Sequence, residues 1–385
     1  MLTETCSSHK PGVLAVSMKF ALFYEIPVQK PFTPGKEHAA YKNTLEQAIL
    51  GDEVGFHAFW TVEHHFLEEY SHCSNPEVLY GAIAARTKNI RIGYGVRLLP
   101  SPYNHPIRSA ESAAVLDLLS DGRVDFGTGR SSTRLELEGF NVDPDQTRDM
   151  WKEALQHIVG AWTEEYYQAD GKYWQMGGPR RVQPKPLQDP HPPIFGATSS
   201  PDGHLEVGRQ GIGLCSFTVG LPPEDLTKSI DLYRQGLGEC TQPVGKFKNE
   251  TAATFTMVHC APTKEEAYDV AKESFEWYPK AGASLIASVA EWMNEKKQAL
   301  GTYEYAASAL QHKNEGAFEH LNFDYIHSVG AGVVGDPDEC IETCKRYEAA
   351  GCDLLLCLVN PFNIPHDKVM QSIELLGKHV IPEFA

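Results

Sequence analysis

The chain has 385 residues, of which 42% are hydrophobic and 10% aromatic, so it can bury one large core or two ordinary ones. Acidic residues outnumber basic ones by 51 to 34, and the formal net charge of −17 argues against nucleic acid as a partner. No apolar run approaches the ~18 to 20 uncharged residues of a membrane span, so we expect a cytoplasmic protein without a membrane partner. The nine cysteines are odd in number and include no Cys-x-x-Cys pair, which predicts reduced thiols.

The first 17 residues are polar and contain only one short apolar piece, Val13–Val16. This piece is too short for the core of a signal peptide, so residues 1–17 are predicted to be a flexible N-terminal extension. A strand-like run follows Met18 at once. We therefore expect one folded domain over residues 18–385.

Strand-like runs alternate with helical patterns along this domain. The predicted strands are Phe20–Tyr24, Ala58–Val62, Ile90–Leu99, Val124–Thr128, Ile194–Ala197, Gly213–Phe217, Thr251–His259 and Leu354–Leu358. The predicted helices are Ala39–Glu53, Glu77–Thr87, Pro106–Leu119, Arg148–Gly160, Pro222–Gly236, Lys264–Phe275, Pro337–Ala350 and His366–Lys378. Eight strands, nearly all followed by a helix, predict an α/β fold of the (β/α)8 TIM-barrel type.

Two stretches exceed a minimal barrel. Residues 163–193 are rich in Tyr, Trp, Gly and Pro and are predicted to form an irregular excursion before the fifth strand. Residues 276–330 are predicted to be a helical insertion with weak periodicity. Insertions on a barrel usually become lids or pocket walls, so we expect loop insertions on a single barrel domain.

The run Glu63-His64-His65-Phe66 stands at the predicted exit of the second strand. Catalytic residues of barrels lie at the carboxyl ends of strands. Because neighbouring strand residues point to opposite sides, one histidine is expected to be catalytic and the other structural. A buried, hydrogen-bonded histidine is the alternative interpretation. Adjacent histidines diverge, unlike the usual zinc ligands, so no metal site is expected.

Glycines and hydroxyl groups mark three further strand ends. Gly93 and Gly95 interrupt the third strand, which suggests either a flat group close to the backbone or packing against a bulky neighbour. Arg130 follows the Gly-x-Gly end of the fourth strand, and Ser199-Ser200 precede a Pro-initiated helix start. A phosphate dianion between this helix start and Arg130 is one interpretation. A solvated arginine and a simple serine helix cap are the other.

Taken in order, these motifs resemble those of the bacterial-luciferase-like family of flavin-dependent monooxygenases. The matching segments are Glu63–Phe66, Gly93–Pro100, His105–Arg108, Ser120–Arg123, Phe126–Arg130 and Ala197–Ser200. The resemblance covers about Met18–Phe217, and Val333–Leu358 is also similar to the last strand and helix of the family.

The resemblance implies a TIM barrel that binds reduced FMN, a co-substrate, at the carboxyl ends of its strands. It assigns the binding of the FMN phosphate to Arg130, Ser199, Ser200 and the amides near Gly203. It implies an unusual cis peptide under the flavin ring at Gly95 and Val96, and it makes His64 the catalytic residue. The implied partners are a small organic substrate, molecular oxygen and a separate flavin reductase, and a homodimer is expected.

The chain departs from luciferase itself at two positions. Gly129 stands where luciferase has a cysteine, and Thr198 stands where luciferase has an acid. Both differences argue against light emission and a fatty-aldehyde substrate, but they are compatible with activation of oxygen. His64, with an ordinary pKa of about 6.5, can then serve as acid or base in monooxygenation. The alternatives are a deazaflavin-dependent hydride-transfer oxidoreductase, a non-catalytic flavin-binding protein and an unrelated metal-dependent barrel enzyme.

Overall fold

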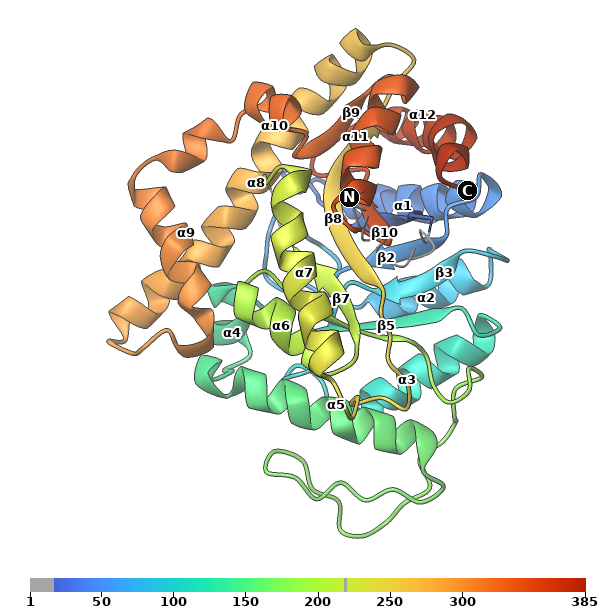
Figure 1. Ribbon diagram of the computed structural model, residues 1–385, viewed down its shortest axis with the longest axis vertical. Coiled ribbons are helices and arrows are strands. Elements are labelled where there is room, and N and C mark those ends of the chain that lie inside the picture. Colours follow the sequence, from blue (N-terminus) through green and yellow to red (C-terminus); the bar gives the residue numbers. More distant parts are fainter. Residues whose placement is uncertain (1–16, 218–219) are drawn as a thin grey trace, which may run out of the picture.

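A computed structural model describes residues 17–217 and 220–385, and a barrel of parallel strands lies at its centre (Figure 1). The strands are β1 (Lys19–Tyr24), β2 (Ala58–Thr61), β3 (Arg91–Tyr94), β4 (Arg97–Leu98), β5 (Val124–Gly129), β6 (Ile194–Thr198), β7 (Gly213–Ser216), β8 (Ala252–Cys260), β9 (Gly332–Gly335) and β10 (Leu354–Leu358). The predicted N-terminal extension lies outside the described residues except for Ser17.

The strands close into a ring in the order β10-β1-β2-β3-β5-β6-β7-β8, because β8 also pairs with β10. All of these pairings are parallel. The prediction of a (β/α)8 barrel is confirmed, and each of the eight predicted strands is present. Every residue of β5, β8 and β10 is buried, as expected for strands covered on both faces.

Two details of the sheet differ from the prediction. The predicted strand Ile90–Leu99 is divided into β3 and β4, and the cis peptide bond Gly95–Val96 lies between them. A further strand, β9, pairs with the second half of β8. In β9 only two valines stand between Gly332 and Gly335, so the sequence shows no apolar run that would indicate a strand.

Helices surround the barrel. They are α1 (Lys36–Glu53), α2 (Pro76–Ala84), α3 (Pro106–Leu119), α4 (Arg134–Gly139), α5 (Thr147–Thr163), α6 (Pro201–Arg209), α7 (Pro223–Glu239), α8 (Lys264–Glu295), α9 (Glu304–Asn314), α10 (Phe323–Val329), α11 (Pro337–Ala349) and α12 (His366–Leu375). Short helical turns are η1 (Pro144–Gln146), η2 (Gly301–Tyr303), η3 (Ala317–His320), η4 (Leu376–Val380) and η5 (Ile381–Phe384). No helix within the described residues is long and apolar enough to cross a membrane.

The two stretches outside the minimal barrel differ in structure. Residues 164–193 contain no helix or strand and form the long loop below α5 in Figure 1. The predicted helix Lys264–Phe275 is too short, because α8 continues through Pro279 to Glu295. The second half of α8, with η2, α9, η3 and α10, therefore makes up the helical stretch at 276–330.

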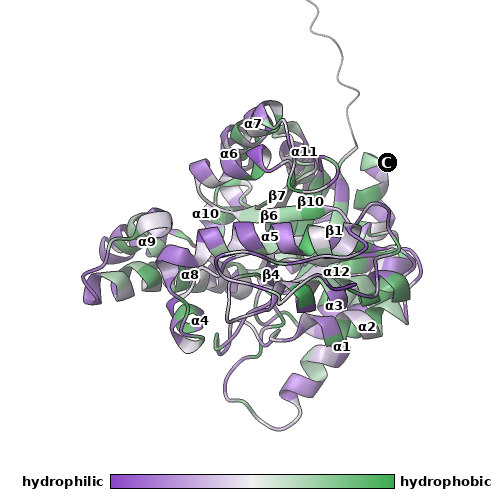
Figure 2. Cartoon of the chain, turned by 90° about the horizontal axis from the view of Figure 1, so that it is seen from below, coloured by the Kyte–Doolittle hydropathy of each residue, from purple (hydrophilic) through white to green (hydrophobic). Residues whose placement is uncertain are grey.

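The main hydrophobic core fills the barrel and the space between strands and helices. In Figure 2 the strands are mostly green, whereas helices such as α5 and α8 carry both green and purple residues, as amphipathic helices do. A second, smaller core joins α4, α8, η2 and α9. It attaches the helical stretch to the barrel near α4. The eight cysteines in the described part of the chain are buried and form no disulfide.

Candidate active site

The carboxyl ends of β1, β2 and β3 meet at one end of the barrel. Tyr24, Thr61 and Tyr94 stand in register across the three strands. The residues that follow these strands are therefore neighbours in space. They include Glu25 after β1 and the Glu63–Phe66 run after β2.

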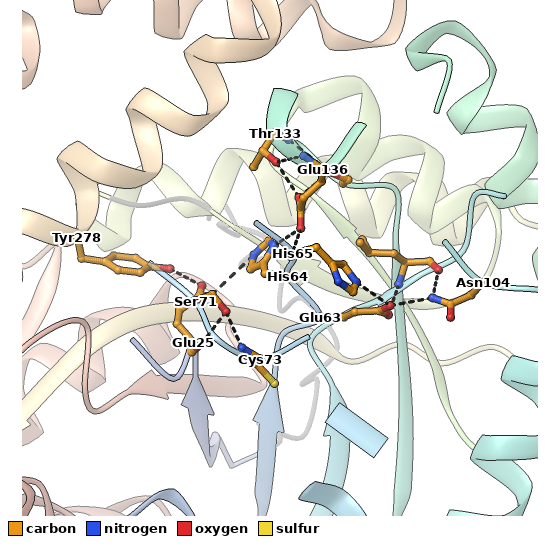
Figure 3. A network of polar contacts seen from close by, with 12 residues as sticks. Glu25, Glu63, His64, His65, Ser71, Cys73, Asn104, Thr133, Glu136 and Tyr278 are labelled. Carbon is orange, nitrogen blue, oxygen red and sulfur yellow. Dashed lines mark hydrogen bonds and ion pairs between the residues drawn. The ribbon is translucent and has the colours of Figure 1, made fainter. Parts of the chain in front are cut away.

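His64 is bound by a buried carboxylate from α4. Its Nδ1 lies 2.9 Å from Oε1 of Glu136, and the Glu136 side chain is fully buried (Figure 3). Glu136 also accepts hydrogen bonds from the hydroxyls of Ser131 (2.7 Å) and Thr133 (2.8 Å) and from the amide of His65 (3.0 Å). Four donors thus hold this carboxylate in one orientation, and it in turn orients the imidazole.

His64 and Glu136 each stabilise the charged form of the other. Burial lowers the pKa of His64, but the charge and hydrogen bond of Glu136, with smaller contributions from Glu25 and Glu63, outweigh burial and raise the pKa to about 9. Burial raises the pKa of Glu136, but the charge of His64 and the hydrogen bonds to the carboxylate outweigh it and keep this pKa below its usual value. At neutral pH the pair is an imidazolium and a carboxylate. His64 can therefore act as a proton donor, whereas its ordinary pKa left acid and base equally open.

Glu25 lies on the opposite side of the His64 ring. Its Oε2 is 3.8 Å from His64 Nε2, and its Oε1 accepts a hydrogen bond from the Tyr278 hydroxyl at 2.8 Å. Burial raises the pKa of Glu25 to about 7, although the positive charge of His64 and the Tyr278 hydroxyl act against this rise. The two carboxyl groups beside His64 thus have pKa values shifted in opposite directions.

Glu63 and His65 have other partners. Glu63 accepts hydrogen bonds from the Leu98 amide (3.0 Å) and the Asn104 side chain (2.9 Å), and it lies 3.6 Å from the Arg97 guanidinium. His65 Nε2 lies 3.4 Å from Glu63, and the His65 ring packs edge-on against the ring of Phe140, which directly follows α4. Glu63 thereby ties the end of β2 to β4. The imidazole rings of the two adjacent histidines thus contact different carboxylates.

Val96, which follows Gly95 between β3 and β4, packs closely against Gly129. A Cβ atom on Gly129 would stand 2.4 Å from Cγ2 of Val96 and 3.7 Å from Cβ of Ala197, so the ends of β5 and β6 contact the segment between β3 and β4. A Cβ on Gly95 would stand 2.7 Å from the Phe23 ring. The bulky-neighbour interpretation therefore holds for both glycines of the third predicted strand, because the Trp60 indole fills the place of a Gly93 side chain in the same way.

Arg130 is positioned by residues that the sequence analysis did not single out. Its Nη1 donates to the hydroxyls of Thr147 (3.0 Å) and Thr302 (2.8 Å), and the guanidinium lies 5.1 Å from the centre of the Tyr303 ring. The Tyr303 hydroxyl also donates to the carbonyl of Ser131. Thr302 and Tyr303 belong to η2. Because Thr302 lies 172 positions after Arg130 in the sequence, no local pattern could indicate this contact.

The helix start at Ser200 has the predicted cap. Ser200 Oγ accepts a hydrogen bond from the Gly203 amide at 3.2 Å, while Ser199 is exposed. The simple-cap interpretation is therefore correct for Ser200, and its hydroxyl proton remains free to donate. Because β5 and β6 pair through Thr128 and Gly196, Arg130 and this helix start follow neighbouring strands.

These residues fit the phosphate of a flavin mononucleotide. A Cβ on Gly203 would stand 1.9 Å from the Thr198 hydroxyl and 2.9 Å from the Ser200 hydroxyl, so this turn gathers hydroxyl groups around a helix N-terminus. A guanidinium, hydroxyl groups and helix amides are the donors that bind phosphate groups in proteins. No group of three or more His, Cys, Asp and Glu within the described residues is arranged to hold a metal ion.

Two further residues at the site escaped the sequence analysis. Glu136 stands in the pattern Thr133-x-x-Glu136, a capping box that predicts a helix start. That pattern could have found α4, but not the contact of Glu136 with His64. Glu25 directly follows the apolar strand β1. Like Glu63 at the exit of β2, Glu25 stands at the carboxyl end of a strand, where the catalytic residues of barrels lie.

A parallel barrel with an acid–histidine pair and a set of phosphate-type donors at its carboxyl end is the arrangement of a (β/α)8-barrel enzyme with its site at the strand ends. Within this class, the model of the luciferase-like monooxygenase family matches residues 18–354, and the chain belongs to this family.

Known proteins with a similar chain or fold are flavin- and F420-dependent enzymes. The chain is 25% identical over 374 residues to the oxygenase component of the flavin-dependent trigonelline monooxygenase of Acinetobacter baylyi, with 96% of each chain covered. The oxygenating constituent of 3,6-diketocamphane monooxygenase of Pseudomonas putida, solved with FMN, has a TM-score of 0.73 at 20% identity, covering 95% and 99%. An F420-dependent secondary alcohol dehydrogenase has a TM-score of 0.71 at 20% identity, covering 96% and 99%. The two structures show the shared fold, whereas the family and the Acinetobacter relative support an oxidoreductase of the general class of flavin-dependent monooxygenases.

Proposed function

We propose that the protein is the oxygenase component of a two-component monooxygenase that uses reduced FMN and molecular oxygen to insert one oxygen atom into a small organic substrate. The observation that supports the proposal best is the pairing of His64 with the buried Glu136, which favours a protonated imidazole beyond the end of β2. The family and the name of the Acinetobacter relative, an oxygenase component, support the separate flavin reductase.

Each proposed site residue has a defined task. Arg130, Ser199, Ser200 and the amides near Gly203 would hold the phosphate of FMN, and Gly95 and Val96 would line the place of its ring. When bound, reduced FMN supplies the electrons that activate oxygen. Glu136 holds Nδ1 of His64, so the proton on Nε2 is the one that His64 transfers.

We also propose that two copies associate through α2 and α3. These helices pack against each other and expose the apolar residues Val78, Val115, Leu118 and Leu119. Two copies of a chain with a net charge of −17 repel each other over most of their surface, so an apolar face is the suitable contact between them. Since a reductase must deliver reduced FMN, we place both proteins in the cytoplasm.

The decisive experiment compares cofactors. Purified protein is mixed anaerobically with photoreduced FMN or with reduced F420, then exposed to oxygen and a panel of small organic compounds. Substrate-dependent oxygen consumption with reduced FMN, and a product heavier by one oxygen atom, is the expected result. Hydride transfer from reduced F420 without oxygen uptake would replace the proposal with the deazaflavin-dependent alternative. FMN binding without any turnover would favour a flavin-binding protein.

A further inference from the structure

The Glu25 carboxyl has one oxygen bound and one without a partner. Oε1 accepts the hydrogen bond from Tyr278, whereas Oε2 is buried and has no hydrogen-bond partner within the described residues. A buried polar atom that lacks a partner costs free energy, so such an atom at an active site indicates a role. The group that faces Oε2 is Nε2 of His64, at 3.8 Å.

This separation suits a single bridging oxygen atom. A distance of 3.8 Å exceeds a hydrogen bond but allows one water oxygen to contact both atoms. His64 Nε2 carries the proton that the proposed reaction uses, because Nδ1 is engaged with Glu136. Oε2 of Glu25 is therefore the carboxyl oxygen closest to the proton that leaves.

Tyr278 fixes Glu25 from the side of α8. Its ring stacks on that of Tyr70, with the centroids 5.1 Å apart and the planes at 16°. Both tyrosines are held in place, so the Glu25 carboxyl has little freedom to turn. Figure 3 shows His64 between Glu136 on one side and the Glu25–Tyr278 pair on the other.

The titratable groups around Glu25 and His64 can be sorted into neutral and charged ones at neutral pH. Those facing the two side chains are Glu63 from the end of β2, Tyr70 and Cys73 from the following loop, Glu136 from α4 and Tyr278 from α8. Burial raises the pKa of Cys73 to about 12 and those of both tyrosines well above their usual value, so these three stay neutral. Glu136 stays ionised, and Glu63 is paired with Arg97.

We propose that Glu25 is a positioning residue that acts through His64 and returns a proton to it in each catalytic cycle. This inference rests on the proposed function of His64 as proton donor. After His64 has given up the proton on Nε2, the Glu25 acid releases its proton to a bridging water, and that water passes one of its own protons to Nε2. One O–H bond breaks at Glu25 and one N–H bond forms at His64. No group is oxidised or reduced, and the Glu25 carboxylate regains a proton from solvent.

The test uses the full chain and the near-isosteric variant Glu25→Gln. The amide oxygen can still accept the Tyr278 hydrogen bond, but the side chain can no longer carry the proton. NMR of ¹³C,¹⁵N-histidine-labelled protein without cofactor follows His64 from pH 5 to 10, with Glu25→Asp as the variant that keeps the acid. We expect a lower His64 pKa in Glu25→Gln, since the negative charge that supports the imidazolium is gone, and a return toward the wild-type value in Glu25→Asp.

A second variant separates the relay from simple packing. Tyr278→Phe removes the donor that favours ionised Glu25, so the inflection that Glu25 imposes on the His64 resonance should move to higher pH. The matched control is Glu68→Gln, which makes the same chemical change at an exposed position and should alter neither inflection. In oxygen-consumption assays, Glu25→Gln should lower turnover about 10-fold and remove the limb of the pH profile near 7, with the Km for reduced FMN unchanged.

The outcomes distinguish this inference from the proposed function. An identical His64 titration in wild type and Glu25→Gln overturns the inference, even if the protein proves to be a monooxygenase. If Glu25→Gln does not fold, an unchanged titration in Tyr278→Phe has the same meaning. A lowered His64 pKa in a protein that never consumes oxygen with reduced FMN supports the coupling and overturns the proposed function.

Discussion

Glu136 binds His64 across 72 positions of sequence, and it is the carboxylate that makes this histidine a cation in the neutral range. The contact joins α4, a helix of six residues, to the end of β2. Four hydrogen-bond donors surround Glu136, so the geometry of the pair is fixed before any ligand enters. Such preorganisation is what a proton donor needs in order to act without rearrangement.

Replacement of His64 by alanine should lower turnover about 10²- to 10⁴-fold, because a positioned acid contributes this much to the rate. The affinity for FMN should change little, since the proposed phosphate site follows β5 and β6. Stopped-flow oxygen consumption and fluorescence titration with FMN measure the two effects. Wild-type turnover in His64→Ala would remove His64 from the mechanism.

Replacement of Glu136 by glutamine should lower the His64 pKa from about 9, because the charge that outweighs burial is lost. An acid can donate its proton only while the pH is below its pKa. As the pH rises, the activity of Glu136→Gln should therefore begin to decline at a lower pH than that of the wild type. We expect a roughly 10- to 100-fold loss at pH 8 and a smaller one at pH 6. The control is Glu138→Gln on the same helix, which is exposed and paired with Arg134. Equal pH profiles for wild type and Glu136→Gln would contradict the ion pair.

Replacement of Glu25 by glutamine should also change stability with pH. The Glu25 pKa is about 7 in the folded protein and about 4.5 when exposed, so the fold favours its neutral form. That contribution is complete below about pH 4.5 and is lost as the pH rises through 7, amounting to on the order of 2 to 3 kcal/mol. Relative to wild type, Glu25→Gln should therefore gain about 2 to 4 °C in Tm between pH 5 and pH 8. Differential scanning calorimetry at the two pH values measures this, and a constant Tm difference would refute it.

Replacement of Arg130 by methionine should weaken FMN binding about 10- to 100-fold, because a charge-assisted bond to phosphate is lost. Riboflavin, which has no phosphate, should bind wild type and variant equally. Isothermal titration with both flavins tests this, and Arg134→Met, which removes a half-buried arginine at the start of α4, is the control. A similar loss of riboflavin binding in Arg130→Met would mean that Arg130 supports the barrel mouth rather than the phosphate.

The barrel itself could be predicted because most of its strand residues are buried and give short, mainly apolar runs between helical patterns. β10 and α3 have the predicted bounds, Leu354–Leu358 and Pro106–Leu119. The length of α8 could not be predicted, because Pro279 within it normally indicates a helix end. Here the surrounding core residues keep the helix continuous.

The candidate site could be predicted only where a motif is local. His64, Arg130 and Ser200 stand beside strand ends and turns that are visible in the sequence. Their partners Glu136, Glu25 and Thr302 come from other elements, and tertiary packing alone brings them together. The protonation state of His64 depends on those partners, so an isolated motif could not decide between acid and base.

The hydrogen bond between Arg130 and Thr302 limits how this protein can be re-engineered. The helical stretch at 276–330 invites exchange with that of a relative, as a way to alter the choice of substrate. Yet η2 lies within it and orients the arginine proposed for the cofactor phosphate. A graft that omits Gly301–Tyr303 would give up cofactor affinity together with the old specificity, so chimeras should keep these three residues and exchange only the helices on either side.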